Sequence, residues 1–174
     1  MNLDESRAEM SEPFRIHKPL ARNNSSKSEV QILCLNIKCL SAHINELSAY
    51  LFVHRPHIVL IQETWLDDSV KSVNVLGYET VSRRDRKATE NRGGVLILQR
   101  GDFNALILIE NRKTEERNWH FLRLDSETVL LANWYRPGAS TIGFDNLQSE
   151  ISRHYEGSTG VLVARDLNIH RKKK

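Results

Sequence analysis

The chain has 174 residues, of which 27% are charged and 40% are hydrophobic, and its formal net charge at pH 7 is +3. A chain of this length fits one domain, which can bury roughly 70% of its unfolded surface. The small net charge does not by itself indicate a nucleic-acid partner. Cys34 and Cys39 are too few for a disulfide framework, and we predict two buried thiols in a reducing compartment.

No apolar stretch approaches the roughly 18 residues of a membrane helix, and residues 1–5 lack the basic opening of a signal peptide. We therefore expect an intracellular protein that is neither secreted nor bound to a membrane. Residues 1–28 are polar and show no sustained periodicity, which predicts a disordered leader. The domain should span residues 29–174.

The first predicted element is a strand over residues 30–37, which is apolar on both faces and therefore central in a sheet. A helix should follow, capped by Ser41 and ended before Pro56, because apolar residues recur there at helical spacing. Residues 57–62 are then predicted to form a strand parallel to the first. This order predicts a β-α-β unit.

The rest of the chain predicts strands and one more helix. The strands are expected over residues 77–82, 95–98, 105–109, 119–124, 128–134 and 160–164, and the helix over residues 144–151 with its end at Gly157. We expect the strands over residues 95–98 and 105–109 to form a hairpin that turns at residues 101–104. The strands on either side of residues 125–127 should also pair.

Polar side chains stand at the C-terminal ends of four predicted strands, namely Asn36, Glu63, Tyr135 and the pair Asp166 and Asn168. In open α/β sheets ligands collect at such ends, so Glu63 is a candidate metal ligand. Each residue also has a purely structural interpretation. Glu63 could be a solvated acid, Tyr135 a core aromatic, and Asp166 and Asn168 turn formers. Only the ordered set favours a functional site.

These strand-end residues, in this order, resemble those of the endonuclease/exonuclease/phosphatase superfamily. The sequence motifs around them resemble the apurinic-endonuclease-like domain of non-LTR retrotransposons. The matching segments lie between residues 30 and 170 and are Leu35-Asn36-Ile37, residues 55–65, Gly77-Tyr78, Arg83-Arg84-Asp85-Arg86, Gly93-Gly94-Val95, Tyr135-Arg136-Pro137 and residues 166–170. The resemblance implies an α/β (α+β) fold in which two packed mixed β-sheets are flanked by helices, a four-layer sandwich. It also implies that the domain is truncated at its C-terminus and that its second sheet is incomplete.

The resemblance further implies a DNA-nicking endonuclease that hydrolyses phosphodiesters with Mg²⁺, or with Mn²⁺ in its place. Glu63 and Asn36 match the residues that hold the metal, since a hard cation prefers oxygen ligands. Asp166 matches the residue that orients or deprotonates the attacking water. Asn168 and Tyr135 match phosphate contacts.

Basic residues gather between residues 82 and 92 and again at the C-terminus. Such loops would contact phosphates without reading sequence, although ordinary solvated loops explain the same charges. The predicted DNA-binding residues are Arg84, Arg86, Lys87, Arg136 and His170. The resemblance implies a monomer in the nucleus, and in intact relatives a larger polyprotein with a reverse transcriptase.

A second copy of the family's Gly-Asp-Phe-Asn motif occurs at residues 101–104, before the strand of Tyr135. Its position in a predicted turn rejects Asp102 as the catalytic aspartate. Glu115 or Glu116 could lie near the site, and the sequence does not choose between them.

Two departures from the family pattern bear on activity. Arg165 replaces the glycine that precedes the catalytic aspartate, which would cost about 1 kcal/mol if that position needs an unusual backbone angle. The chain also ends at Lys174, before the family's catalytic histidine segment. We therefore expect marginal folding and poor DNA cleavage. The alternatives are a non-catalytic remnant that binds nucleic acid and a phosphatase acting on a small phosphorylated molecule or lipid.

Overall fold

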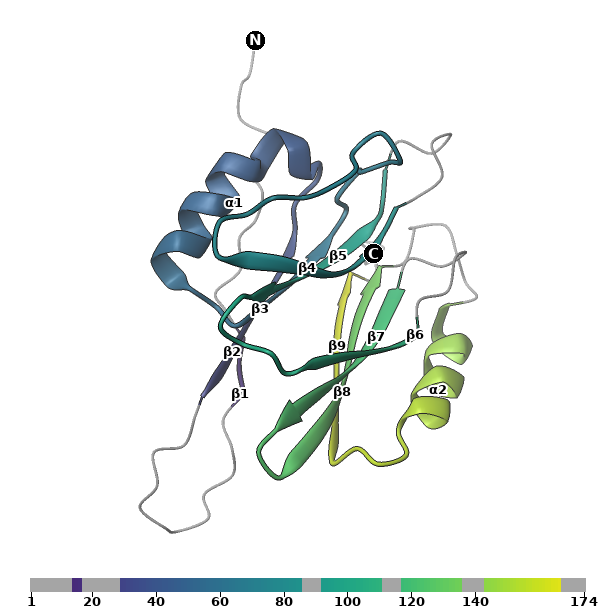
Figure 1. Cartoon of the computed structure of the whole chain (residues 1–174). Coiled ribbons are helices and arrows are strands. Elements are labelled where there is room, and N and C mark those ends of the chain that lie inside the picture. The colour runs from purple at the N-terminus through teal and green to yellow at the C-terminus, as the bar shows by residue number, and fades with distance from the viewer. Residues whose placement is uncertain (1–13, 17–28, 86–91, 111–116, 136–142, 167–174) are drawn as a thin grey trace, which may run out of the picture.

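The structure is a computed structural model that describes residues 14–16, 29–85, 92–110, 117–135 and 143–166. In this part of the chain nine strands form two sheets, which pack face to face between two helices (Figure 1). The first sheet has the strand order β1-β2-β3-β5-β4, and the second has the order β6-β7-β8-β9.

The strands of the first sheet are β1 (Phe14–Ile16), β2 (Val30–Asn36), β3 (Ile58–Gln62), β4 (Tyr78–Arg84) and β5 (Val95–Arg100). Those of the second sheet are β6 (Leu106–Glu110), β7 (Arg117–Leu124), β8 (Glu127–Tyr135) and β9 (Gly160–Asp166). The helices are α1 (Leu40–His54) and α2 (Gly143–His154).

Three apolar clusters fill the spaces between the layers. Leu47 and Leu51 of α1 pack on the outer face of the first sheet. Side chains such as Leu60 and Leu131 meet between the two sheets. Leu147 of α2 packs on the outer face of the second sheet. The predicted four-layer sandwich of two mixed sheets is therefore confirmed.

Among the strands described above, each sheet contains one parallel pair, and each pair is connected through a helix. β2 and β3 are parallel and flank α1, as predicted, while β8 and β9 are parallel and flank α2. A crossover through a helix brings the carboxyl ends of both strands to one edge of the sheet. Asn36 is consequently aligned with Gln62, and Tyr135 with Asp166.

Within the predicted leader, Phe14–Ile16 forms β1, which pairs antiparallel with the start of β2. The prediction of a leader without regular structure is thus wrong for these residues, because a three-residue strand is too short to show a period. The rest of residues 1–28 lies outside the described part. No helix among the described residues is both long and apolar enough to cross a membrane.

The helix α1 starts at Leu40 rather than after a cap at Ser41. Cys39 occupies the N-cap position without a side-chain hydrogen bond. The backbone N–H groups of Cys39 and Leu40 instead donate to the carbonyls of Glu63 and Thr64, at 3.0 and 2.8 Å. Tertiary hydrogen bonds therefore replace the expected cap. Cys34 and Cys39 are half-buried rather than buried, and neither forms a disulfide within the described residues.

The predicted hairpin of β5 and β6 is wrong, whereas the predicted pair of β7 and β8 is confirmed. β5 and β6 belong to different sheets, so residues 101–105 carry the chain from the first sheet to the second. A turn signal in the sequence fixes where the chain bends, but the sheet that receives the next strand depends on contacts distant in sequence.

A buried amide joins the two sheets. The Asn133 Nδ2 atom donates to the carbonyl oxygens of Ile61 and Leu96, at 3.0 and 3.1 Å. Its Oδ1 atom accepts a hydrogen bond of 2.6 Å from Nε2 of Gln62. Both donor hydrogens and the acceptor are thereby satisfied in the interior. Asn133 of β8 is thus fixed to both β3 and β5.

Two other polar side chains on the inner face of the second sheet are buried without such compensation. Asn118 and His120 are both 0% exposed, and no described residue forms a hydrogen bond with their side chains. Asn118 lies opposite Asn133 in the ladder, and His120 lies opposite Leu131. Burial lowers the pKa of His120 to about 4, because the apolar interior disfavours its charged form.

We expect His120 to make stability fall on acidification. Unfolded histidine titrates near about 6.5, so the unfolded chain binds a proton more readily than the folded chain. Above pH ~6.5 the neutral ring leaves the free energy of unfolding at its full value. As the pH falls toward about 4 the free energy of unfolding decreases by roughly 3 kcal/mol, and below that pH His120 changes it no further. Urea unfolding of wild type and His120→Leu between these pH values measures this decrease in the free energy of unfolding. A His54→Gln variant, changed at an exposed position, is the control, and equal slopes for His120→Leu and wild type would contradict the expectation.

Candidate metal and phosphate site at the strand ends

Glu63 is the first residue after the buried strand β3, and its carboxylate is bound by one residue of the second sheet and one residue of its own loop. Its Oε1 atom accepts a hydrogen bond of 3.0 Å from the hydroxyl of Tyr135, the last residue of β8. Its Oε2 atom accepts one of 3.0 Å from the indole Nε1–H of Trp65. The structure therefore brings together two of the predicted site residues, which are 72 positions apart in the sequence.

The loop that carries Glu63 has an unfavourable backbone conformation. Glu63 and Trp65 have φ angles of 53° and 52°, in the left-handed region that costs side-chain-bearing residues about 1–2 kcal/mol each. Such conformations persist where the surroundings over-determine them, and they cluster at functional sites. The hydrogen bonds from Cys39 and Leu40 hold this loop from one side.

Two glycines hold the same loop from the other side. The backbone N–H groups of Thr64 and Trp65 donate to the carbonyls of Gly94 and Gly93, at 3.3 and 2.9 Å. Gly94 has a φ of 87°, and a methyl group on it would overlap the Thr64 hydroxyl and approach the Arg84 carbonyl oxygen to 3.2 Å. Only glycine allows this close approach. The glycine pair therefore fixes the loop of Glu63.

We expect Gly94→Ala to destabilise the chain by about 2–4 kcal/mol, since the left-handed backbone and the overlap with Thr64 act together. Gly77→Ala is the matched control, because Gly77 has a φ of 81° but open space around its Cβ position. That control should cost only about 1 kcal/mol. Chemical denaturation of both variants measures the difference. Equal costs would show that the contact with Thr64 is unimportant.

Asn36 ends β2 beside the strand of Glu63. It is half-buried, and its Oδ1 atom accepts a hydrogen bond of 3.2 Å from the backbone N–H of Lys38. Among the described residues, no three His, Cys, Asp or Glu side chains gather into a group that could hold a metal. Mg²⁺ does not need such a group, because it usually binds one or two carboxylates and keeps several waters. The oxygen donors Glu63 and Asn36 fit that cation.

Asp166 is the last residue of β9, and its backbone is aligned with that of Tyr135. The structure does not describe its side chain. Several other predicted residues lie outside the described part, and their roles stay predictions: Arg86, Lys87, Glu115, Glu116, Arg136, Asn168 and His170.

Arg165 does not show the strain that the family pattern suggested. It lies within β9, is aligned with Trp134 and has an exposed side chain. It is not among the described non-glycine residues with a positive φ. The backbone before Asp166 therefore does not require glycine in this chain.

The start of the basic segment has a structural role. The guanidinium of Arg83 donates to the carbonyls of Val70 and Asp67, at 2.6 and 2.8 Å, and pairs with Asp85. It thus fixes the preceding loop to β4. Arg84 is half-buried, and its burial lowers the pKa of its guanidinium.

The second Gly-Asp-Phe-Asn copy lies at the opposite end of the first sheet. Asp102 is exposed and pairs with Arg100, whose Nη1 also donates to the carbonyl of Arg55, before β3 begins. The hydrogen bond from Arg100 lowers the pKa of Asp102. Glu63 follows the other end of β3, so Asp102 is not part of its site.

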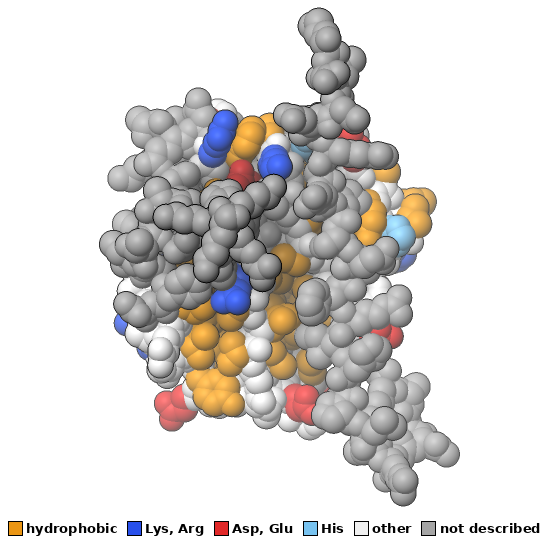
Figure 2. Space-filling model, turned by 180° about the vertical axis from the view of Figure 1, so that it is seen from behind, with side chains coloured by type: hydrophobic (Ala, Val, Ile, Leu, Met, Phe, Trp, Pro, Cys, Tyr) orange, Lys and Arg blue, Asp and Glu red, His pale blue; other side chains and the backbone are white. Residues whose placement is uncertain are grey.

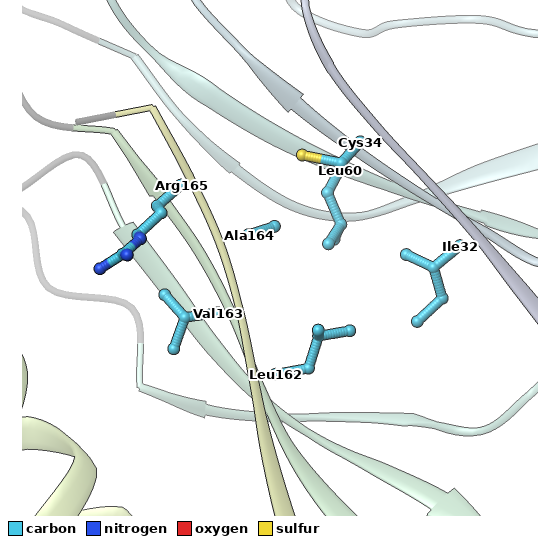
Figure 3. A pocket seen from close by; sticks show the side chains of 7 residues that line it. All are labelled: Ile32, Cys34, Leu60, Leu162, Val163, Ala164 and Arg165. Atoms are coloured by element: carbon cyan, nitrogen blue, oxygen red, sulfur yellow. The ribbon is translucent and has the colours of Figure 1, made fainter. Parts of the chain in front are cut away.

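An apolar cavity of about 200 Å³ lies between β2 and β3 of the first sheet and β9 of the second (Figure 3). Its lining consists of Ile32, Cys34, Leu60, Leu162, Val163, Ala164 and Arg165. In the described part β9 pairs only with β8, and Val161 is 38% exposed at this edge. Apolar side chains gather on the face seen from behind (Figure 2). Apart from Arg165 this lining is uncharged, so the cavity offers little to bind a phosphate.

Two mixed sheets packed face to face between helices are also the arrangement of solved structures with the endonuclease/exonuclease/phosphatase fold. An AP endonuclease from Leishmania major has this fold, with a TM-score of 0.64 and 17% identity over 80% of this chain and 55% of that one. The endonuclease domain of TRAS1, a telomere-specific non-LTR retrotransposon, is also similar. Its TM-score is 0.58, with 18% identity over 81% of this chain and 61% of that one.

A third similar structure is the 3′ phosphatase NExo from Neisseria bound to a product DNA hairpin, with a TM-score of 0.52 and 14% identity over 79% of this chain and 57% of that one. The chain therefore spans less than two thirds of each of these structures. No model of a protein family matches the sequence, and no curated protein sequence matches it. At these identities the likeness shows the fold.

The hydrogen bond between Tyr135 and Glu63 can be measured by a double-mutant cycle. We expect Tyr135→Phe to cost about 1–2 kcal/mol, because it removes a hydrogen bond to a charged acceptor. In a Glu63→Ala background the same change should cost clearly less. Unfolding free energies of the four proteins give the coupling, and Tyr155→Phe, at an exposed tyrosine, is the control. A coupling of zero would mean that the bond contributes nothing.

Proposed function

We propose that this chain is the core of a DNA-nicking endonuclease that hydrolyses phosphodiesters with Mg²⁺, or with Mn²⁺ in its place. One observation carries the proposal: the Glu63 carboxylate stands at the carboxyl ends of strands from both sheets, in a loop held against its backbone preference. A buried strand followed by a strained, hydrogen-bonded acid is typical of a functional site.

In the proposed reaction Glu63 and Asn36 would hold the cation, which would offset negative charge on the scissile phosphate. In the free protein Tyr135 donates its one hydroxyl proton to the Glu63 carboxylate, and in the proposed complex with DNA that proton turns to a phosphate oxygen. Asp166, at the end of β9, accepts a proton from the attacking water. The water oxygen bonds to phosphorus as the P–O bond to the leaving strand breaks, and the leaving oxygen departs as an alkoxide that takes a proton from bulk water. Asn168 donates its amide N–H to a phosphate oxygen.

Two similar structures support DNA as the substrate, because one is a retrotransposon endonuclease domain and the other holds a product DNA hairpin. The proposed contacts with the DNA backbone are Arg84, Arg86, Lys87, Arg136 and His170. A monomer in the nucleus belongs to the same proposal, as does a larger polyprotein with a reverse transcriptase in intact relatives.

Nicking of supercoiled plasmid tests this function. We expect slow nicking that requires Mg²⁺ and falls at least ~100-fold in Glu63→Ala, because the variant loses the proposed cation ligand. Asp102→Ala is the matched control, since it removes the aspartate of the second Gly-Asp-Phe-Asn copy at the far end of the sheet. Its nicking rate should equal that of the wild type.

Nicking that survives Glu63→Ala would contradict the proposal, because the activity would then come from another site or from a contaminant. DNA binding without any Mg²⁺-dependent cleavage would favour the non-catalytic remnant. Release of inorganic phosphate from small phosphate esters, with no nicking, would favour the phosphatase.

A further inference from the structure

We infer that Trp65 is a positioning residue for the Glu63 carboxylate and thereby sets the affinity of the site for divalent cations. This inference rests on the proposed function, because it concerns the same cation site. Trp65 was not among the site residues predicted from the sequence, although it belongs to the segment that contains Glu63.

The indole of Trp65 has the chemistry of a dedicated orienting group. Its Nε1–H is a donor only, and it binds Oε2 of Glu63 at 3.0 Å while Tyr135 binds Oε1. Each carboxylate oxygen has more than one lone-pair position, so both keep capacity for a cation. Hydrogen bonds of this kind orient a metal-binding carboxylate. Their loss commonly weakens metal affinity by roughly 10–100-fold.

Trp65 is itself held in place from two sides. Its backbone N–H donates to the Gly93 carbonyl at 2.9 Å, and its φ of 52° turns the chain within the loop. The guanidinium carbon of Arg92 lies 5.8 Å from the centre of the indole ring, within the range of a cation–π contact. Backbone and ring contacts together fix the direction of the indole N–H.

A second indole–carboxylate pair in the chain differs, because the charge of its carboxylate is already neutralised by an arginine. Trp119 Nε1 donates to Oε2 of Glu150 at 2.8 Å, and Arg117 forms an ion pair with the same carboxylate. Glu150 is only 4% exposed, so its charge is buried and neutralised. The two donors recorded for Glu63 among the described residues are both neutral. Its negative charge thus remains for a cation.

Isothermal titration calorimetry with Mg²⁺ or Mn²⁺ alone tests this inference in the full chain. We expect Trp65→Phe to weaken cation binding about tenfold or more while circular dichroism shows a folded protein. Trp119→Phe is the matched control, because it breaks an indole–carboxylate pair elsewhere and should leave cation affinity unchanged. Trp65→His keeps a ring N–H donor and should recover affinity relative to Trp65→Phe.

Intrinsic fluorescence gives a second measurement. Cation binding should change the emission of wild type and Trp119→Phe, but not that of Trp65→Phe, because Trp65 is the tryptophan whose indole binds the Glu63 carboxylate. Equal cation affinities of Trp65→Phe and wild type would overturn this inference and leave the proposed function intact. Absence of cation binding by the wild type would overturn the metal site itself and, with it, both proposals.

Discussion

The buried amide of Asn133 is the interaction on which the candidate site depends. It joins the second sheet to the carbonyls of two strands of the first and accepts a hydrogen bond from Gln62, the residue before Glu63. Leaving one such buried group unpaired costs about 1–3 kcal/mol, so the two sheets are held in one relative position. Tyr135 follows Asn133 by two residues and therefore projects from the same face of β8. The hydrogen bonds of Asn133 thus help to place the Tyr135 hydroxyl within hydrogen-bond distance of the Glu63 carboxylate.

The sequence predicted the β-α-β unit and the four layers because long apolar runs, separated by turn residues, specify elements locally. It did not predict where β6 would pair, since residues 101–105 bend the chain in the same way for a hairpin and for a crossing between sheets. It also missed β1, whose three residues carry no periodic signal. Partner choice and very short edge strands are decided by distant contacts, which a single sequence does not display.

The strand-end pattern identified Glu63, Asn36 and Tyr135, because the fold places carboxyl ends together. It did not identify Trp65 or Asn133. A signal for Asn133 was present, since a polar residue two positions before Tyr135 shares its face in a buried strand. Nothing comparable existed for Trp65. Its contact with Glu63 arises from positive φ angles at residues other than glycine, and composition gives no sign of such angles.

The positive φ angles have a consequence for how this chain would change under selection. Four of the six described non-glycine residues with such angles, Lys38, Cys39, Glu63 and Trp65, lie in the two loops at the candidate site. Glycine at any of them would relieve backbone strain of about 1 kcal/mol or more. A screen of random variants for heat resistance alone would therefore enrich replacements in these loops. In such a screen the conformation of the loops that hold the Glu63 carboxylate would change before the apolar core did.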